Sequence, residues 1–96
     1  MNSISVIKLL RKFKEENQAK YKLLRIALFG SYAKNKTEKD SDIDIAVEIA
    51  DPDIFVLSRI KYDLEKIYKR KVDLIRLRDK MNSYLKENIE KDGIFV

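Results

Sequence analysis

The spacing of apolar side chains predicts that the chain begins with an amphipathic helix. Across residues 3–20, apolar residues recur at helical intervals and charged residues fill the positions between them. The positions at intervals i, i+3, i+4 and i+7 are Val6, Leu9, Leu10 and Phe13. Such intervals place side chains on one face of a helix. We therefore expect this helix, capped by Ser3 or Ser5, to cover one face of a sheet.

Two strands are predicted next, separated by a turn and a polar loop. Residues 23–29 form an apolar run interrupted only by Arg25, which is typical of a central strand, and Gly30 ends the run. A brief helical turn is expected over residues 31–36. Residues 42–48 alternate between two faces, with Ile43, Ile45 and Val47 on one and Asp42, Asp44, Ala46 and Glu48 on the other. This strand is therefore expected to pack on helices with its apolar face and to present carboxylates on the opposite face.

A helix start is predicted directly after the second strand. Asp51 is expected to be the N-cap, Pro52 the first helical residue, and Asp53 part of the first turn. The helix is expected to run to about Arg70. Its predicted buried stripe consists of Leu57, Ile60, Leu64, Ile67 and Tyr68.

A third strand and a last helix are predicted for the rest of the chain. Residues 71–77 read KVDLIRL, a strand with Asp73 in its interior. Asp79 is expected to cap the last helix, and Gly93 suits the C′ position that follows it. The side chains expected to face inward are Met81, Tyr84, Leu85 and Ile89. Residues 94–96 are apolar and could dock as a short strand or join a partner surface.

The expected order of elements is α-β-β-α-β-α. This order predicts an α/β (α+β) fold in which helices pack mainly on one face of a small mixed β-sheet. A length of 96 residues corresponds to one domain. We therefore expect residues 1–96 to form a single domain.

Composition limits the chemistry that this chain can perform. The net charge of +5 favours an anionic partner, such as a nucleotide, a nucleic acid or an acidic protein surface. The absence of cysteine excludes disulfides and Cys-containing zinc sites, and the absence of histidine leaves proton transfer to carboxylates, lysines or tyrosines. The N-terminal region has no uninterrupted apolar stretch of the length that a signal peptide or membrane span needs. A cytoplasmic protein is therefore expected.

Three aspartates are the candidate metal ligands. Asp42 and Asp44 have the i, i+2 spacing that places two side chains on the same face of a strand. Two carboxylates this close repel each other unless a cation lies between them, and magnesium is the usual oxygen-liganded ion. Asp73 would complete a two-metal site from a neighbouring strand. The structural alternatives are a turn or cap residue for Asp42 and an edge-strand charge that prevents aggregation for Asp73.

The Gly30-Ser31 pair after the first strand is a candidate phosphate cradle. Glycine lets the backbone approach an anion closely, and the serine hydroxyl adds a hydrogen-bond donor. Lys34, Lys36 and Lys39 add positive charge beside the pair. The alternatives are an ordinary turn followed by a solvated, charged loop.

The stretch GSYAKNKTEKDSDIDIAV resembles the signature of the DNA polymerase beta superfamily of nucleotidyltransferases, in which G-S-x-A-x-G precedes S-D-x-D. In size the chain is similar to the minimal nucleotidyltransferase (MNT) family of bacteria and archaea. The resemblance covers nearly the whole chain, including the aspartate in VDLI. One position departs from the pattern, because Asn35 stands where the signature has its second glycine. Asparagine tolerates the left-handed conformation better than other non-glycine residues, so the turn geometry can survive.

The resemblance implies a nucleotidyltransferase fold and a role for each matching residue. The nucleotide-binding residues that it implies are Gly30, Ser31, Lys34 and Ser41. The implied catalytic and metal-binding residues are Asp42, Asp44 and Asp73, which would hold magnesium as two ions. Asp73 would also act as general base toward the attacking hydroxyl.

The resemblance also implies a reaction and a partner. MNT proteins are commonly antitoxins paired with a HEPN-domain ribonuclease toxin, so a hetero-oligomer is expected. Some of them neutralise the toxin by transferring AMP from ATP to one of its hydroxyl groups, with tyrosine as the expected acceptor. The alternative is a non-catalytic antitoxin that masks the toxin by contact. Direct nucleic-acid binding is not expected, because no basic patch interleaved with aromatic residues supports it. For Tyr32, Tyr62 and Tyr84, packing in the core or at its rim is expected over a partner surface.

Overall fold

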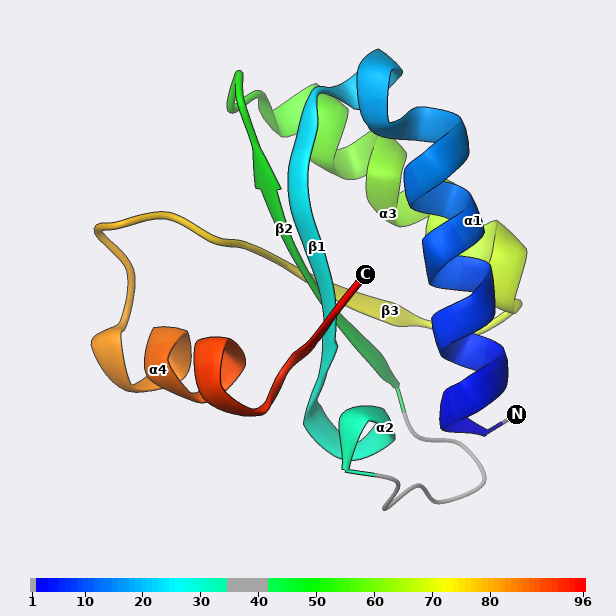
Figure 1. Ribbon diagram of the computed structural model, residues 1–96. Helices are drawn as coiled ribbons and strands as arrows, with labels where there is room; N and C mark the ends of the chain where they lie inside the picture. Colours follow the sequence, from blue (N-terminus) through cyan, green and yellow to red (C-terminus); the bar gives the residue numbers. More distant parts are fainter. Residues whose placement is uncertain (1, 35–41) are drawn as a thin grey trace.

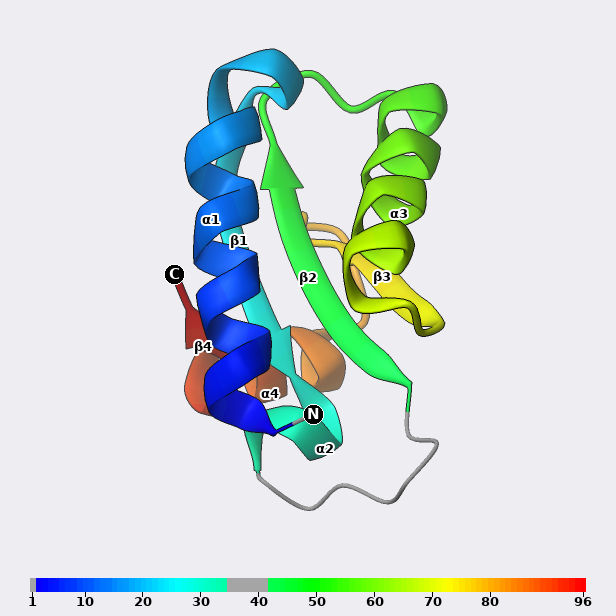
Figure 2. The ribbon, with the colours of Figure 1, turned by 90° about the vertical axis from the view of Figure 1, so that its right-hand side faces the viewer.

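The computed structural model describes residues 2–34 and 42–96, which form a four-stranded mixed sheet with helices on both faces (Figures 1 and 2). The helices are α1 (Ser3–Tyr21), α2 (Gly30–Ala33), α3 (Ile54–Tyr68) and α4 (Ser83–Asp92). The strands are β1 (Leu23–Phe29), β2 (Ile43–Ile49), β3 (Val72–Arg76) and β4 (Ile94–Phe95). The predicted α-β-β-α-β-α order is confirmed, with α2 as the expected helical turn and β4 as a short last strand. None of the helices in these two ranges is both long and apolar enough to span a membrane.

The sheet has the order β3-β2-β1-β4. β1 runs antiparallel to both β2 and β4, whereas β2 and β3 are parallel. The two long helices, α1 and α3, lie together on one face of the sheet, and the shorter α4 lies on the other (Figure 2). The prediction that helices pack mainly on one face is therefore confirmed for the long helices, and α4 adds a smaller second layer.

The two faces of β2 supply two separate hydrophobic clusters. Ile43, Ile45 and Val47 are fully buried in the larger cluster, together with residues of α1 and α3. Ala46 belongs to a smaller cluster with Leu77 and Ile89, underneath α4. Because successive side chains of a strand point to opposite faces, Asp44 and Glu48 share the α4 side with Ala46. The predicted division of this strand into an apolar face and a carboxylate face is confirmed.

The three longer helices begin at side-chain caps other than the predicted ones. The observed caps are Asn2 for α1, Asp53 for α3 and Asn82 for α4, each accepting a backbone N–H of the first turn. The predicted caps, Ser3 or Ser5, Asp51 and Asp79, were therefore wrong, and Pro52 precedes the helix rather than opening it. Several suitable cap residues lie near each helix start, and only the residue directly before the first helical position can act. Gly93 ends α4 as predicted, although with extended backbone rather than the left-handed form.

Some side chains expected to face the core are exposed. Tyr84 is 75% exposed and Ile67 is 38% exposed, so both predictions of burial were wrong. Tyr32 is only 1% exposed and belongs to the larger hydrophobic cluster, as expected, whereas Tyr62 is 59% exposed on α3. Apolar periodicity locates the buried face of a helix, but it does not show how far the partner layer extends over that face.

A buried hydroxyl ties α3 to α1. Tyr68 donates a hydrogen bond of 2.8 Å to the backbone carbonyl of Val6. Tyr68→Phe removes this bond and should lower the free energy of unfolding by about 0.5–1.5 kcal/mol. Tyr62→Phe makes the same chemical change at an exposed site and should alter it by less than about 0.5 kcal/mol. Urea denaturation of both variants measures the difference, and equal effects would contradict the role of this bond.

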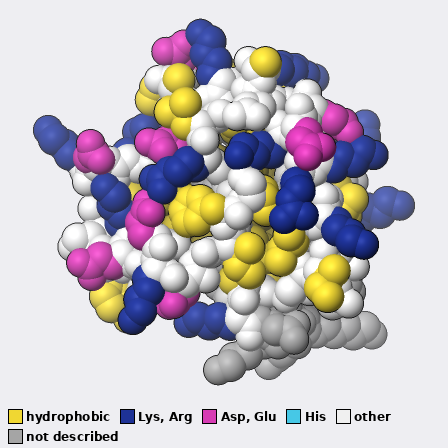
Figure 3. Space-filling model, viewed as in Figure 1, with side chains coloured by type: hydrophobic (Ala, Val, Ile, Leu, Met, Phe, Trp, Pro, Cys, Tyr) yellow, Lys and Arg dark blue, Asp and Glu magenta, His cyan; other side chains and the backbone are white. Residues whose placement is uncertain are grey.

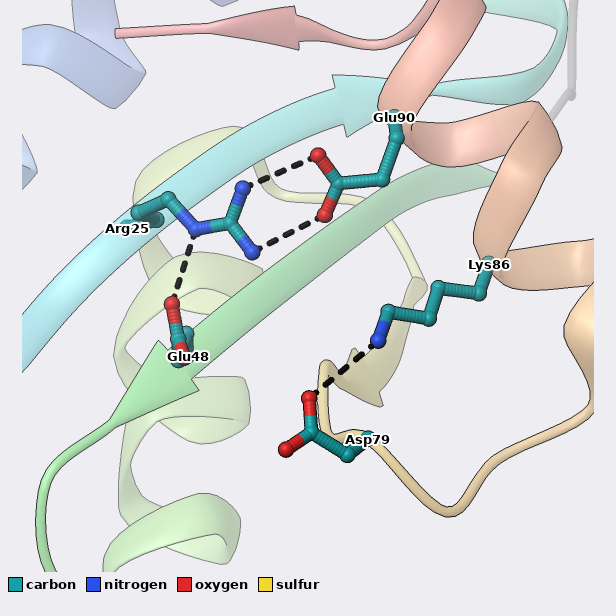
Figure 4. A network of polar contacts seen from close by, with 5 residues as sticks. All are labelled: Arg25, Glu48, Asp79, Lys86 and Glu90. Carbon is teal, nitrogen blue, oxygen red and sulfur yellow. Dashed lines mark hydrogen bonds and ion pairs between the residues drawn. The ribbon is translucent and has the colours of Figure 1, made fainter.

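Arg25 connects β1, β2 and α4 on the carboxylate side of the sheet (Figure 4). Its Nε donates to Glu48 at 2.8 Å, and its two terminal nitrogens donate to Glu90 at 3.0 and 2.9 Å. The guanidinium also lies 5.1 Å from the ring centre of Phe95. Two parallel hydrogen bonds from a planar guanidinium to one carboxylate fix the relative position of the two side chains more closely than a single charge contact does. The network therefore holds α4 over the sheet.

The Arg25–Glu90 pair makes stability depend on acid pH. The hydrogen bonds from Arg25 lower the pKa of Glu90 below its ordinary value. A lowered pKa in the folded state stabilises the fold above the unfolded pKa, and the stabilisation is lost as pH falls through the folded pKa. Wild type should exceed Glu90→Gln in unfolding free energy by about 0.2–1 kcal/mol at pH 7, and this difference should shrink toward pH 3. Glu87→Gln, which removes a carboxylate from the same helix, is the control in parallel denaturation series.

Candidate functional site

Two of the predicted aspartates lie side by side on neighbouring strands. In the parallel pairing of β2 with β3, Asp44 is the direct partner of Asp73. The Glu65 carboxylate of α3 accepts the backbone N–H of Val72 at 3.0 Å, which anchors the start of β3 one residue before Asp73. The structure thus brings together two residues that are separated in the sequence by the whole of α3.

The charge of Asp44 is unfavourable in this position. Its pKa is raised above the ordinary value, first by burial and then by the negative charges of Asp73 and Asp42. A hydrogen bond with Asp73 adds to the shift. Carboxylates arranged this way lose their mutual repulsion when a cation binds between them. Hard oxygen donors of this kind are the ligands that magnesium prefers, so the Asp44–Asp73 pair fits such an ion.

The third aspartate, Asp42, lies immediately before β2 and forms an ion pair with a lysine. Lys71 Nζ is 3.8 Å from Asp42 Oδ2. In residues 2–34 and 42–96, no group of three or more acidic, His or Cys side chains has the arrangement to hold a metal ion. Asp44 and Asp73 are therefore already juxtaposed. Asp42 would have to leave its ion pair with Lys71 to bind the same metal ion as these two aspartates.

The turn between β1 and α2 lies directly against the Asp44 side chain. Phe29, the last residue of β1, pairs with Asp44 across the sheet. Gly30 follows with a positive φ of 73°, a conformation that side-chain-bearing residues rarely adopt. A Cβ added to Gly30 would lie 3.0 Å from Cγ and 3.2 Å from Cβ of Asp44. Glycine is therefore required here both by backbone conformation and by lack of space.

The predicted nucleotide-binding residues lie in or beside this turn where the structure describes them. Gly30 and Ser31 begin α2, and Lys34 directly follows it. Ser41 lies outside the described residues, as does the signature departure at Asn35, and their predicted roles stay predictions. The structure thus places Gly30, Ser31 and Lys34 in one short segment next to Asp44.

A cleft that the sequence did not reveal opens between this segment and α4. Its volume is about 250 Å³, and its walls combine the β1–α2 turn with one side of α4. The lining residues are Phe29, Gly30, Ala33 and Lys34 on one side and Tyr84, Leu85, Asn88 and Asp92 on the other. The spacing of 84, 88 and 92 is a signal that could have indicated a second functional face of α4, because residues four apart share one side of a helix.

Positive charge does not form a continuous track on the face seen in Figure 3. Lys and Arg side chains are spread over this face, and Asp and Glu side chains lie among them. A protein that follows a nucleic-acid backbone collects its basic residues in a groove or stripe. This face therefore does not have the charge pattern of a nucleic-acid-binding surface.

Comparison with known proteins agrees with this geometry. The family described as "Nucleotidyltransferase domain" matches residues 10–96. A Methanocaldococcus jannaschii protein named as a candidate protein adenylyltransferase, MJ0126, is 41% identical over 98 residues, covering 100% of both chains.

Two solved structures of complexes are also similar to this chain. One is a toxin–antitoxin with AMP-PNP, at 33% identity and a TM-score of 0.71, covering 99% of this chain and 72% of that one. The other is a tri-AMPylated Shewanella oneidensis HEPN toxin in complex with an MNT antitoxin, at 34% identity and a TM-score of 0.62. That match covers 98% of this chain and 67% of the other. With the paired aspartates beside a glycine turn, these matches show that the chain belongs to the nucleotidyltransferase family.

Proposed function

We propose that this chain is an antitoxin that transfers AMP from ATP to a hydroxyl group of a HEPN ribonuclease toxin and thereby neutralises it. The observation that carries the proposal is the pairing of Asp44 with Asp73 beside the Gly30 turn. The two similar complexes give further support, because one contains a toxin that carries AMP and the other is a toxin–antitoxin with AMP-PNP. Tyrosine is the proposed acceptor, and the cytoplasmic location predicted from the sequence stays a prediction.

The residues of the site divide into a phosphate group and a carboxylate group. Gly30, Ser31, Lys34 and Ser41 are proposed to hold the triphosphate. Asp42, Asp44 and Asp73 would hold magnesium, in the expected number of two ions. When bound, magnesium would neutralise charge that develops on the phosphate oxygens.

The chemistry that remains for the protein is positioning and one proton transfer. Asp73 accepts the proton of the acceptor hydroxyl, and the hydroxyl oxygen forms a bond to the α-phosphorus of ATP. The bond from that phosphorus to the bridging oxygen of the β-phosphate breaks, and pyrophosphate leaves with the electron pair. Lys34, next to the Gly30 turn, stabilises the charge on the leaving phosphates.

The test is a transfer assay with a HEPN-domain toxin as the acceptor protein. The two proteins are incubated with ATP and magnesium, and intact mass followed by peptide sequencing locates any added AMP. AMP on a toxin tyrosine, lost when the metal is chelated, is the expected result. If this chain silences the toxin with no nucleotide present and no added mass, the alternative of a masking antitoxin is correct. An unmodified toxin that keeps its ribonuclease activity would overturn both.

A further inference from the structure

We propose that the cleft between α2 and α4 holds the nucleoside of the substrate and that Asn88 selects adenine over guanine. This inference rests on the proposed function, since it takes a nucleoside triphosphate as the ligand. The cleft has a volume of about 250 Å³ and includes Gly30 and Lys34 in its wall. A nucleotide whose triphosphate lies at that turn would have its nucleoside within reach of α4, which forms the opposite wall of the cleft.

The order of residues along α4 matches the order of groups in a nucleotide. Ile94 of β4 pairs with Leu28 of β1, so the C-terminal end of α4 is the end nearest the Gly30 turn. From that end, Asp92, Asn88 and Tyr84 follow one another at intervals of about 6 Å along the helix axis. Asp92 lies where ribose hydroxyls can donate to a carboxylate. Asn88 and Tyr84 lie farther out, where the base would be.

The amide of Asn88 distinguishes adenine from guanine by its donor and acceptor pair. Its oxygen can accept from the adenine N6 amino group while its nitrogen donates to ring nitrogen N7. On the same edge guanine presents two acceptors, O6 and N7, so whichever way the amide is turned its oxygen faces another acceptor. Asn88 is exposed on α4, and the side chain is accessible to a ligand in the cleft.

Tyr84 supplies a flat surface for the same base. It is 75% exposed, yet it lines the cleft rather than packing in the core. Stacking of a base on an aromatic ring does not depend on which base it is. Tyr84 is therefore assigned to affinity for any nucleotide, whereas Asn88 is assigned to the choice between purines.

The experiment measures ATP and GTP binding to the chain without its partner, by calorimetric titration in magnesium buffer. Wild type should bind ATP more tightly than GTP. Asn88→Leu, which keeps the size but removes the amide, should weaken ATP by about 5- to 100-fold and leave GTP nearly unchanged. Tyr84→Ala should weaken both nucleotides to a similar extent, and Tyr84→Phe should weaken neither. Glu87→Gln, outside the cleft on the same helix, is the matched control.

Each outcome separates this inference from the proposed function. Three results would overturn the assignment of the cleft. Wild type could bind ATP and GTP with equal affinity, Asn88→Leu could lose the same affinity for both nucleotides, or the chain could bind neither nucleotide. AMP transfer to the toxin together with any of these results leaves the proposed function standing without the base-selecting cleft. The protein could instead prefer ATP over GTP through Asn88 and yet transfer no AMP to the toxin. That result would support the nucleoside site in the cleft and count against the proposed transfer reaction. Circular dichroism of Asn88→Leu confirms that α4 is still folded.

Discussion

Asp44→Asn is expected to lower the rate of AMP transfer by about 10²-fold or more while leaving the protein folded. The substitution keeps the shape of the side chain and removes one of the two juxtaposed negative charges. It therefore weakens the attraction for a cation that the Asp44–Asp73 pair provides. The measurement is the initial rate of AMP incorporation into the toxin at saturating ATP and magnesium.

The same variant should not lose stability. Burial and the charges of Asp73 and Asp42 raise the pKa of Asp44, so its negative charge is a cost to the folded state. Urea denaturation without magnesium should give Asp44→Asn an unfolding free energy equal to or above that of wild type. Asp79→Asn makes the same change at a fully exposed residue outside the site and should retain full transfer activity. A transfer rate within twofold of wild type for Asp44→Asn would rule out the assigned role.

Gly30→Ala is the second substitution for which a large effect is expected. Alanine at a φ of 73° is strained by about 1–2 kcal/mol, and its Cβ would collide with the Asp44 carboxyl group. The free energy of unfolding should fall by about 1–3 kcal/mol. Transfer should also be lost, because relief of the collision moves Asp44 away from Asp73.

Gly30→Asn separates the effect of backbone strain from the effect of the collision with Asp44. Asparagine tolerates positive φ better than alanine, so part of the backbone strain is removed while the collision remains. We expect Gly30→Asn to recover some of the stability lost in Gly30→Ala and none of the activity. Denaturation curves and transfer rates of the two variants provide the comparison. If both variants transfer AMP at the wild-type rate, the turn does not position Asp44.

Local patterns in the sequence predicted most of the secondary structure, and they named the residues of the candidate site, whose roles stay predictions. Alternation in residues 42–48 predicted which side chains of β2 are buried and which side carries carboxylates. The predicted caps failed at Asp51 and Asp79 because neighbouring residues have the same capping chemistry, and the chosen cap depends on where the backbone turns. Tyr84 was misplaced because apolar spacing does not show where the layer beneath a helix ends.

The sequence alone therefore determined the chemical groups at the site: a glycine turn, a lysine next to it, and aspartates on two strands. These follow from side-chain type and short-range periodicity, which need no knowledge of the fold. Tertiary structure alone decided which of these groups meet. The parallel register sets Asp73 beside Asp44, the antiparallel register sets Gly30 against Asp44, and the return of β4 to β1 places α4 next to the turn. Strand register and the docking of α4 depend on contacts between residues far apart in the chain, so no local pattern specifies them.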